Sequence, residues 1–189
     1  MKTVILLSGN RPHAGKDTFV DEFIKQFDLS EANHLKVSLP LKTLAEAAFT
    51  DLTDYISETF GLQTIPENWY EKKNAITRRV LQGLGGKVLD TINPDYLIDD
   101  TIKQINESTE ELFIISDWRK QIEFDKLALG DCKLITIRIV RPGDDVDNNS
   151  TADIEQGLNG FLFDHIIHND SDFETYQDTV SEFIEWMLT

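Results

Sequence analysis

Near its start the chain reads Thr3-Val4-Ile5-Leu6-Leu7-Ser8-Gly9-Asn10-Arg11-Pro12-His13-Ala14-Gly15-Lys16-Asp17-Thr18. The apolar run over residues 3–7 predicts a buried strand, and apolar side chains at helical spacing from Phe19 to Phe27 predict a helix directly afterwards. A glycine-containing turn at a helix N-terminus can surround a phosphate with backbone N–H groups, and the helix dipole there favours negative charge. The sequence therefore predicts a phosphate-binding loop for ATP.

The residue types in this loop fit the phosphates of a nucleotide. Gly9 and Gly15 allow the backbone to approach closely, and Lys16 supplies a charge that can reach the β- and γ-phosphates. Asp17 or Thr18 offers an oxygen to Mg²⁺. We expect the residues that bind ATP here to be Gly9, Asn10, Arg11, His13, Ala14, Gly15, Lys16, Asp17 and Thr18.

The loop departs in two ways from the usual G-x-x-x-x-G-K-[ST] pattern. Five residues rather than four separate Gly9 from Gly15, and Asp17 stands where Ser or Thr is usual. One alternative is a strand–turn–helix connection without a ligand. The second alternative applies only to the middle of the loop. In it, Pro12 stiffens a longer turn and His13 touches no phosphate.

Composition narrows the class of protein. The 189 residues include 18 Lys and Arg against 34 Asp and Glu, and the net charge of −16 disfavours a polymeric nucleic acid as partner. The single cysteine, Cys132, cannot form an intramolecular disulfide, and no stretch approaches the roughly 20 apolar residues that span a bilayer. We expect one domain over residues 1–189 in the cytoplasm, monomeric or homodimeric, with a small-molecule partner and no membrane.

Strand-like and helix-like segments alternate along the chain, which indicates an α/β fold. A second short strand is predicted at His34–Leu39, and a last one at Phe163–Ile167. Two apolar runs between them, Leu112–Ser116 and Lys133–Val140, predict central strands. The acidic, Asn- and Gly-containing segment Pro142–Gly160 predicts a mobile loop, and one interpretation of it is a lid.

The middle third is predicted to be mainly helical. Asn93-Pro94-Asp95 is a plausible start for one of these helices. A C-terminal helix with an apolar stripe is expected from Phe173 to Met187. The apolar positions that predict the middle helices are Leu41, Leu44, Ala45, Ala48 and Phe49, then Val80, Leu81, Leu84 and Val88, then Leu97, Ile98, Ile102 and Ile105.

With Gly15-Lys16-Asp17-Thr18 at the end of its loop, the chain resembles the deoxynucleoside monophosphate kinases of bacteriophages and their bacterial relatives, in which Asp17 is a common trait. Further segments resemble the family in the same order along the chain. These segments are Ser38-Leu39-Pro40-Leu41-Lys42, Arg78-Arg79-Val80-Leu81-Gln82-Gly83-Leu84-Gly85, Ser116-Asp117-Trp118-Arg119 with Glu123, Arg141-Pro142-Gly143, and Ile167-His168-Asn169-Asp170.

The resemblance implies a P-loop NTPase-type, three-layer α/β/α fold with a mainly parallel central sheet. It also implies a helical insertion, residues about 45–108, that binds the nucleoside monophosphate, and a lid-like loop over about 141–160. The chain departs from the family at Leu39, where Asp is usual, and at Lys87 and Asp90, where Glu and Arg are usual. Lys87 and Asp90 are either a charge pair of reversed polarity or a lost substrate contact.

The activity that follows is transfer of the γ-phosphate of ATP to a nucleoside monophosphate, assisted by Mg²⁺. Lys16, Asp117 and the lid arginine Arg141 are the expected catalytic residues, and Asp17, Thr18 and Asp117 the expected metal ligands. The resemblance assigns Asn169 to the donor adenine. It assigns the acceptor nucleotide to Lys42, Arg78, Gln82 and Arg119.

Each assignment has a structural alternative. Asp117 could cap the following helix, and Asn169 could be a turn residue. Lys42 and Arg79 could be solvated surface charges, and Arg138 could face solvent. The aromatic rings of Trp69 and Trp118 are expected to pack in the core more often than to stack on a base.

Two alternative functions fit the same sequence. One is another P-loop small-molecule kinase, of the phosphomevalonate kinase or dephospho-coenzyme A kinase type. The other is a nucleotide-binding protein without catalytic activity, which the extra loop residue and the Lys87/Asp90 reversal would favour. Turnover of a nucleoside monophosphate distinguishes the predicted function from both.

Overall fold

The computed structural model describes residues 1–11, 13–30, 33–47, 80–85, 90–142, 158 and 160–187. The chain forms two compact units, one of Met1–Lys36 with Thr101–Thr189 and the other of Val37–Asp100. Several features predicted from sequence lie outside the described residues. These are Ala48, Phe49, Trp69, Arg78, Arg79, Lys87, Val88 and most of the acidic segment 142–160.

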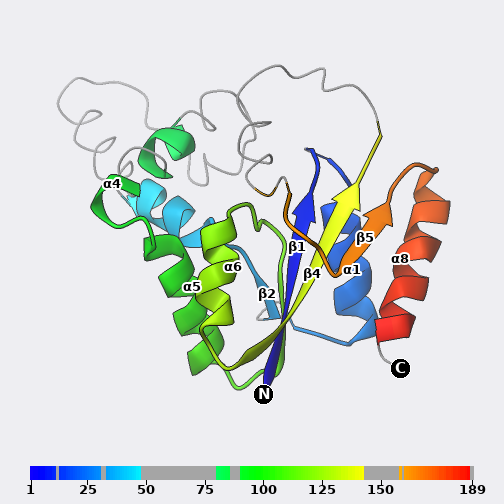
Figure 1. The fold of residues 1–189 in the computed structure, drawn as a ribbon, viewed down its shortest axis with the longest axis horizontal. Helices are drawn as coiled ribbons and strands as arrows, with labels where there is room; N and C mark the ends of the chain where they lie inside the picture. The colour runs from blue at the N-terminus through cyan, green and yellow to red at the C-terminus, as the bar shows by residue number, and fades with distance from the viewer. Residues whose placement is uncertain are drawn as a thin grey trace, which may run out of the picture. The chain divides into compact units, whose positions relative to one another are not determined.

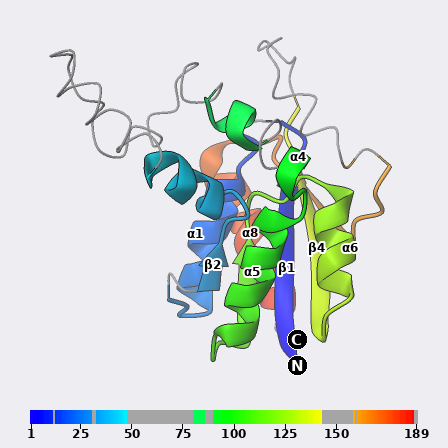
Figure 2. The same ribbon diagram turned by 90° about the vertical axis from the view of Figure 1, so that its left-hand side faces the viewer.

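A parallel sheet forms the centre of the first unit (Figure 1). Its strands are β1 (Lys2–Gly9), β2 (His34–Leu35), β3 (Leu112–Ile115), β4 (Cys132–Val140) and β5 (His165–His168). Their order is β2-β3-β1-β4-β5, and each pair of neighbours is parallel. Figure 2 shows β1 between β2 and β4. The prediction of a mainly parallel α/β fold is confirmed, and β3 and β4 lie inside the sheet as predicted.

Helices pack on the sheet of this unit. On one face lie α1 (Lys16–Gln26) and α8 (Phe173–Met187), which contact each other, while α6 (Gln121–Ala128) contacts β4 from the other side (Figure 1). Strand β1 is therefore covered on both faces. This explains why Val4, Ile5, Leu6 and Leu7 form a continuous apolar run, since all four are fully buried.

The core between the sheet and the α1–α8 pair is built from alternate strand residues and apolar helix stripes. Ile5 and Leu7 point to the same side of β1, where Phe19 and Phe23 of α1 pack. The rings of Phe19 and Phe23 lie 6.1 Å apart. Of the stripe predicted on α8, Tyr176, Val180 and Ile184 are buried, whereas Phe173 is 64% exposed. The prediction for Phe173 is wrong because this residue begins the helix, beyond the cover of the core.

The second predicted strand is shorter than expected. β2 ends at Leu35, and residues 39–47 are helical instead of continuing the strand to Leu39. The amide of Lys42 donates to the carbonyl of Ser38 at 3.2 Å, as in a first helical turn. Pro40 is tolerated here because an amide in the first turn of a helix needs no partner within the helix.

Trp118 belongs to an aromatic cluster in the core and is buried. Its ring lies 5.0 Å from that of Phe161 and 5.5 Å from that of Phe163, and its indole N–H donates to the carbonyl of Lys120 at 2.9 Å. The packing interpretation of Trp118 is thus confirmed. Arg138 lies over the Phe163 ring at 5.2 Å and donates to the Leu158 carbonyl at 3.3 Å, so it does not simply face solvent.

The described part of the second unit is helical. It contains residues 39–47, residues 80–83, α4 (Asp90–Ile92) and the start of α5 (Tyr96–Glu107). The predicted helix start at Asn93 is confirmed, since Asn93 Oδ1 accepts the amide of Asp95 at 3.2 Å and its carbonyl accepts that of Tyr96 at 3.1 Å. Among the described helices, none is long and apolar enough to cross a bilayer.

Candidate active site

The predicted site residues of the first unit lie together at one edge of the sheet, where its parallel strands have their carboxyl ends. Asn10 follows β1, Asp117 comes two residues after β3, Arg141 follows β4 and Asn169 follows β5. Ligands of open parallel sheets bind at this edge. Residues more than a hundred positions apart in sequence thus share one location.

The loop between β1 and α1 uses left-handed backbone at two positions. His13 has φ 59° and Gly15 has φ 112°. Gly15 directly precedes α1, and its carbonyl accepts the first helical hydrogen bond, from the amide of Phe19 at 3.1 Å. The predicted strand–turn–helix context of the loop is confirmed.

Asn10 accounts for the extra residue of the loop. Its amide donates to the carbonyl of Ile139 at 3.0 Å, which continues the β1–β4 ladder beyond Gly9. Its side chain then pairs with the backbone of Arg141, because Nδ2 donates to the Arg141 carbonyl at 3.1 Å and Oδ1 accepts the Arg141 amide at 3.0 Å. The additional residue continues the hydrogen bonding with β4 by one position after the strand ends, and four residues remain between Asn10 and Gly15 for the turn.

Lys16 folds back across the loop. A Cβ atom built on Gly9 would lie 2.8 Å from Lys16 Nζ and 3.0 Å from the Cβ of Ala14. A side chain at position 9 would therefore shift the flexible end of Lys16. The positive charge lies inside the turn, above the end of β1.

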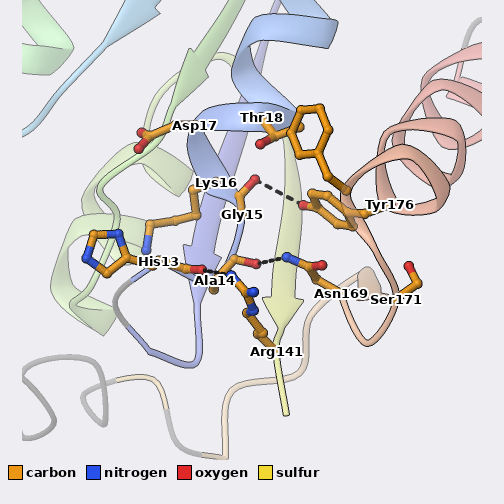
Figure 3. Close-up of a pocket in the computed structure, with 11 residues that line it drawn as sticks. His13, Ala14, Gly15, Lys16, Asp17, Thr18, Arg141, Asn169, Ser171 and Tyr176 are labelled. Carbon is orange, nitrogen blue, oxygen red and sulfur yellow. Dashed lines mark hydrogen bonds between the residues drawn. The ribbon is translucent and has the colours of Figure 1, made fainter. Parts of the chain in front are cut away.

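A cavity of about 260 Å³ lies beside the loop (Figure 3). It is lined by the loop from His13 to Thr18, by Arg141 and Asn169, by Ser171 just before α8, and by Phe173 and Tyr176 in the first turn of α8. The site predicted from sequence does not include the last three of these residues. Phe173 and Tyr176 had been assigned to an apolar stripe. The hydroxyl of Tyr176, a polar group within that apolar stripe, was the signal that could have identified Tyr176 as a site residue.

Two predicted residues hold the loop by its carbonyl groups. Arg141 Nη1 donates to the carbonyl of His13 at 3.0 Å, and Asn169 Nδ2 donates to that of Ala14 at 2.8 Å (Figure 3). Asn169 is also fixed through its own amide, which donates to the carbonyl of Val140 at 2.8 Å. Asn169 is thus more than a turn residue, since its side chain joins β5 to the loop.

Asp17 and Asp117 act electrostatically on the same imidazole. His34 lies 2.7 Å from the hydroxyl of Ser116, through Nε2. Burial and the nearby charge of Lys36 lower the pKa of His34, while the carboxylates of Asp117, Asp17 and Asp21 act in the opposite direction. The two carboxylates predicted to bind metal both contribute to the electrostatic environment of His34.

Asp117 does not occupy the cap position of the next helix. The N-cap residue of α6 is Lys120, and the carboxylate of Glu123 accepts the amides of Arg119 at 3.0 Å and Lys120 at 3.1 Å. Burial raises the pKa of Glu123 against the effect of these two bonds. Because Glu123 satisfies the amides at the start of α6, Asp117 is not needed for that purpose.

The environment of His34 predicts a pH dependence of stability. The folded chain holds the pKa of His34 below 6.5, so the unfolded chain takes up the proton first as pH falls. This residue therefore contributes a loss of stability below about pH 6.5, and His34→Gln should remove that contribution. Urea denaturation of both proteins at about pH 7.5 and about pH 5.5 measures it. If the difference in unfolding free energy between the wild-type chain and His34→Gln were the same at both pH values, the assignment would be contradicted.

The predicted acceptor residues are distributed between the two units. Arg119 follows β3 in the first unit and is half-buried. Lys42 lies in the helix over residues 39–47 and Gln82 in that over residues 80–83, both within the second unit. Arg78 lies outside the described residues.

Comparisons with known proteins give one family and one fold. The model of a family described as deoxynucleotide monophosphate kinase matches residues 25–180, a range that begins after the loop described above. A search of curated proteins found no match. A dephospho-CoA kinase from Campylobacter jejuni is similar in structure, with a TM-score of 0.57, 13% identity, and coverage of 98% of this chain and 97% of that one.

A shikimate kinase from Bacteroides thetaiotaomicron has a TM-score of 0.45 and 13% identity, covering 99% of both chains. At 13% identity, the similarity to the dephospho-CoA kinase concerns the fold alone. It confirms the expected α/β fold of the P-loop kinases.

Proposed function

Because the chain belongs to the deoxynucleotide monophosphate kinase family, we propose that it moves the γ-phosphate of ATP onto a deoxynucleoside monophosphate, giving the diphosphate and ADP. The observation that supports this most directly is the position of Lys16, whose Nζ lies inside the loop and over Gly9. The family match begins at residue 25, so the geometry of the loop supports the proposal independently.

Phosphoryl transfer requires two nucleotides in line and positive charge around the transferred group. In our proposal the amides of the loop and the ammonium of Lys16 hold the phosphates of ATP. Arg141 lies against the same loop, bonded to the carbonyl of His13. Its remaining guanidinium N–H groups would offset charge that develops on the transferred group.

The residues at this edge fit a magnesium ion. Mg²⁺ takes one or two protein carboxylates and completes its coordination with phosphate and water oxygens. Asp17 and Asp117 influence the same imidazole, and Thr18 adds a hydroxyl at the start of α1. No group of three or more His, Cys, Asp or Glu suited to a metal occurs among the residues that the structure describes. Bound by Asp17, Thr18 and Asp117, Mg²⁺ would offset the charge of the ATP phosphates.

We place the nucleoside of ATP in the cavity beside the loop, where Asn169 and the exposed ring of Phe173 are part of the lining. We assign the acceptor nucleotide to the region of residues about 45–108, which includes Arg78 and Gln82, and to two residues outside that range, Lys42 and Arg119. Residues about 141–160 are proposed to act as a lid, beginning with Arg141.

The free thiol of Cys132 and the use of ATP support a cytoplasmic location.

Turnover of the four common deoxynucleoside monophosphates with ATP tests the function. ADP release, coupled to oxidation of a reduced nicotinamide, should exceed the background for at least one of them. Absence of turnover with all four, and turnover of dephospho-coenzyme A or phosphomevalonate instead, would overturn the proposed substrate class. The corresponding ribonucleoside monophosphates, assayed in parallel, show whether the chain discriminates between deoxyribose and ribose.

Asp117→Asn is expected to lower kcat by about 10- to 100-fold, because it removes one of two carboxylates that hold the metal directly or through water. The Mg²⁺ concentration for half-maximal rate should rise at the same time. Asp125→Asn is the matched control, since Asp125 is exposed on α6 and its carboxylate accepts only a surface bond from Gln121 at 2.8 Å among those described. An unchanged Mg²⁺ dependence in Asp117→Asn would show that Asp117 has another role.

A further inference from the structure

Three consecutive carbonyl groups of the phosphate loop each accept a hydrogen bond from the side chain of a different element (Figure 3). The donors come from the ends of β4 and β5 and from the first turn of α8. The bonds join Arg141 Nη1 to the His13 carbonyl at 3.0 Å, Asn169 Nδ2 to the Ala14 carbonyl at 2.8 Å, and the Tyr176 hydroxyl to the Gly15 carbonyl at 3.0 Å.

Fixing a carbonyl group also fixes the amide that follows it. In a planar trans peptide the C=O and the N–H of the next residue point in opposite directions. The three bonds therefore direct the N–H groups of Ala14, Gly15 and Lys16 away from the three donors. Consecutive N–H groups at a helix N-terminus are the donors that a nucleotide phosphate uses.

We propose that Asn169 and Tyr176, together with Arg141, form a carbonyl clamp that holds the phosphate loop in its anion-binding conformation before ATP arrives. The proposal rests on the function proposed above and assigns Asn169 and Tyr176 as positioning residues for the polyphosphate. Arg141 contributes to the clamp and also carries charge near the phosphates, so the clamp is tested on the two uncharged members.

The clamp is rigid and closely fitted. Asn169 and Tyr176 are only 8% and 2% exposed. A Cβ atom on Gly15 would lie 2.7 Å from Asn169 Nδ2 and 2.8 Å from Tyr176 Cε1, so both side chains pack directly against the glycine. Burial raises the pKa of Tyr176 above its usual value, which keeps the hydroxyl protonated and able to donate.

A clamp and a base contact make different predictions for Asn169. If Asn169 reads the adenine of ATP, its removal weakens binding of ATP but leaves a ligand without a base unaffected. If it acts through the loop, binding of any polyphosphate weakens equally. Inorganic tripolyphosphate provides the ligand without a base.

The experiment is titration calorimetry of ATP and of inorganic tripolyphosphate with the wild-type chain, Tyr176→Phe, Asn169→Ala and Asn169→Asp. Tyr176→Phe removes one hydroxyl and is expected to raise the Kd of both ligands by the same factor, about 2- to 10-fold. Asn169→Ala should do likewise. Asn169→Asp keeps the shape but replaces the donor with an acceptor, so it should weaken binding at least as much as Asn169→Ala.

Thr179→Val is the control for loss of a hydroxyl, because Thr179 is exposed on the same helix as Tyr176 and its hydroxyl donates to the carbonyl of Thr175 at 2.9 Å. Thermal unfolding of each variant shows that the fold is retained. An unchanged Kd in Tyr176→Phe, or a weakening in Asn169→Ala confined to ATP, would overturn the clamp while leaving the kinase function intact. A wild-type chain that binds neither ligand would overturn both.

Discussion

Lys16→Ala is expected to lower kcat/KM for phosphoryl transfer by about 1,000-fold while the chain remains folded. The ammonium group is half-buried within the loop, where it would offset charge on the β- and γ-phosphates as the bond to the leaving group breaks. The same coupled ADP-release assay measures the loss. Tripolyphosphate binding should weaken as well, because the charge acts on phosphate rather than on the base.

Lys25→Ala is the matched control for this variant. Lys25 lies on the same helix, its side chain is 74% exposed, and it forms an ion pair at 3.6 Å with Glu22, which is buried. Glu22 keeps its hydrogen bond from Gln177 in this variant, and no effect on transfer is expected. Retained activity in Lys16→Ala would mean that the phosphate loop has been assigned to the wrong part of the chain.

Gly15→Ala is expected to cause the second largest loss of activity, for a reason of geometry rather than charge. The residue has φ 112°, and an added Cβ would lie 2.7 to 2.9 Å from atoms of Asn169 and Tyr176. Backbone strain of about 1–3 kcal/mol and displacement of both side chains should follow. Since a displacement of about 1 Å can cost about 100-fold in rate, we expect a loss of that size in kcat/KM and a lower Tm.

Substitutions at two other glycines separate the two causes of the loss in Gly15→Ala, which are backbone strain and the displacement of neighbouring side chains. Gly130→Ala places a Cβ 3.3 Å from the carbonyl of Leu127, outside the site, and should leave transfer unchanged. Gly160 has φ 86°, and no atom of the described residues lies within 4 Å of an added Cβ, so Gly160→Ala measures the loss of Tm from backbone strain. If Gly15→Ala bound ATP as the wild type does, the close packing around Gly15 would not matter for the site.

Local sequence signals were sufficient for the phosphate loop and the sheet. The apolar run before Gly9 and the helical spacing after Lys16 predicted β1 and α1 because both depend on periodicity over neighbouring residues. The same signals overextended β2, since they could not show that Pro40 falls in the first turn of a helix. The roles of Arg78 and the lid segment remain predictions.

The parts of the site that sequence did not reveal depend on contacts between distant residues. The pairing of Asn10 with Arg141 joins positions 131 apart, and the hydrogen bond from Tyr176 to Gly15 spans 161. No local pattern marks either one. The loop is longer than the usual pattern in sequence, whereas in the structure the amide of Asn10 still bonds to β4 and four residues remain for the turn.

The position of β1 in the sheet also affects how the chain folds. Thr3 pairs with Leu112 on one side and with Lys133 on the other, so both strand partners of β1 lie more than a hundred positions further along the sequence. Pairing between such distant segments makes folding slow. Until it is complete, the four apolar residues of β1 that are buried in the folded chain are open to aggregation.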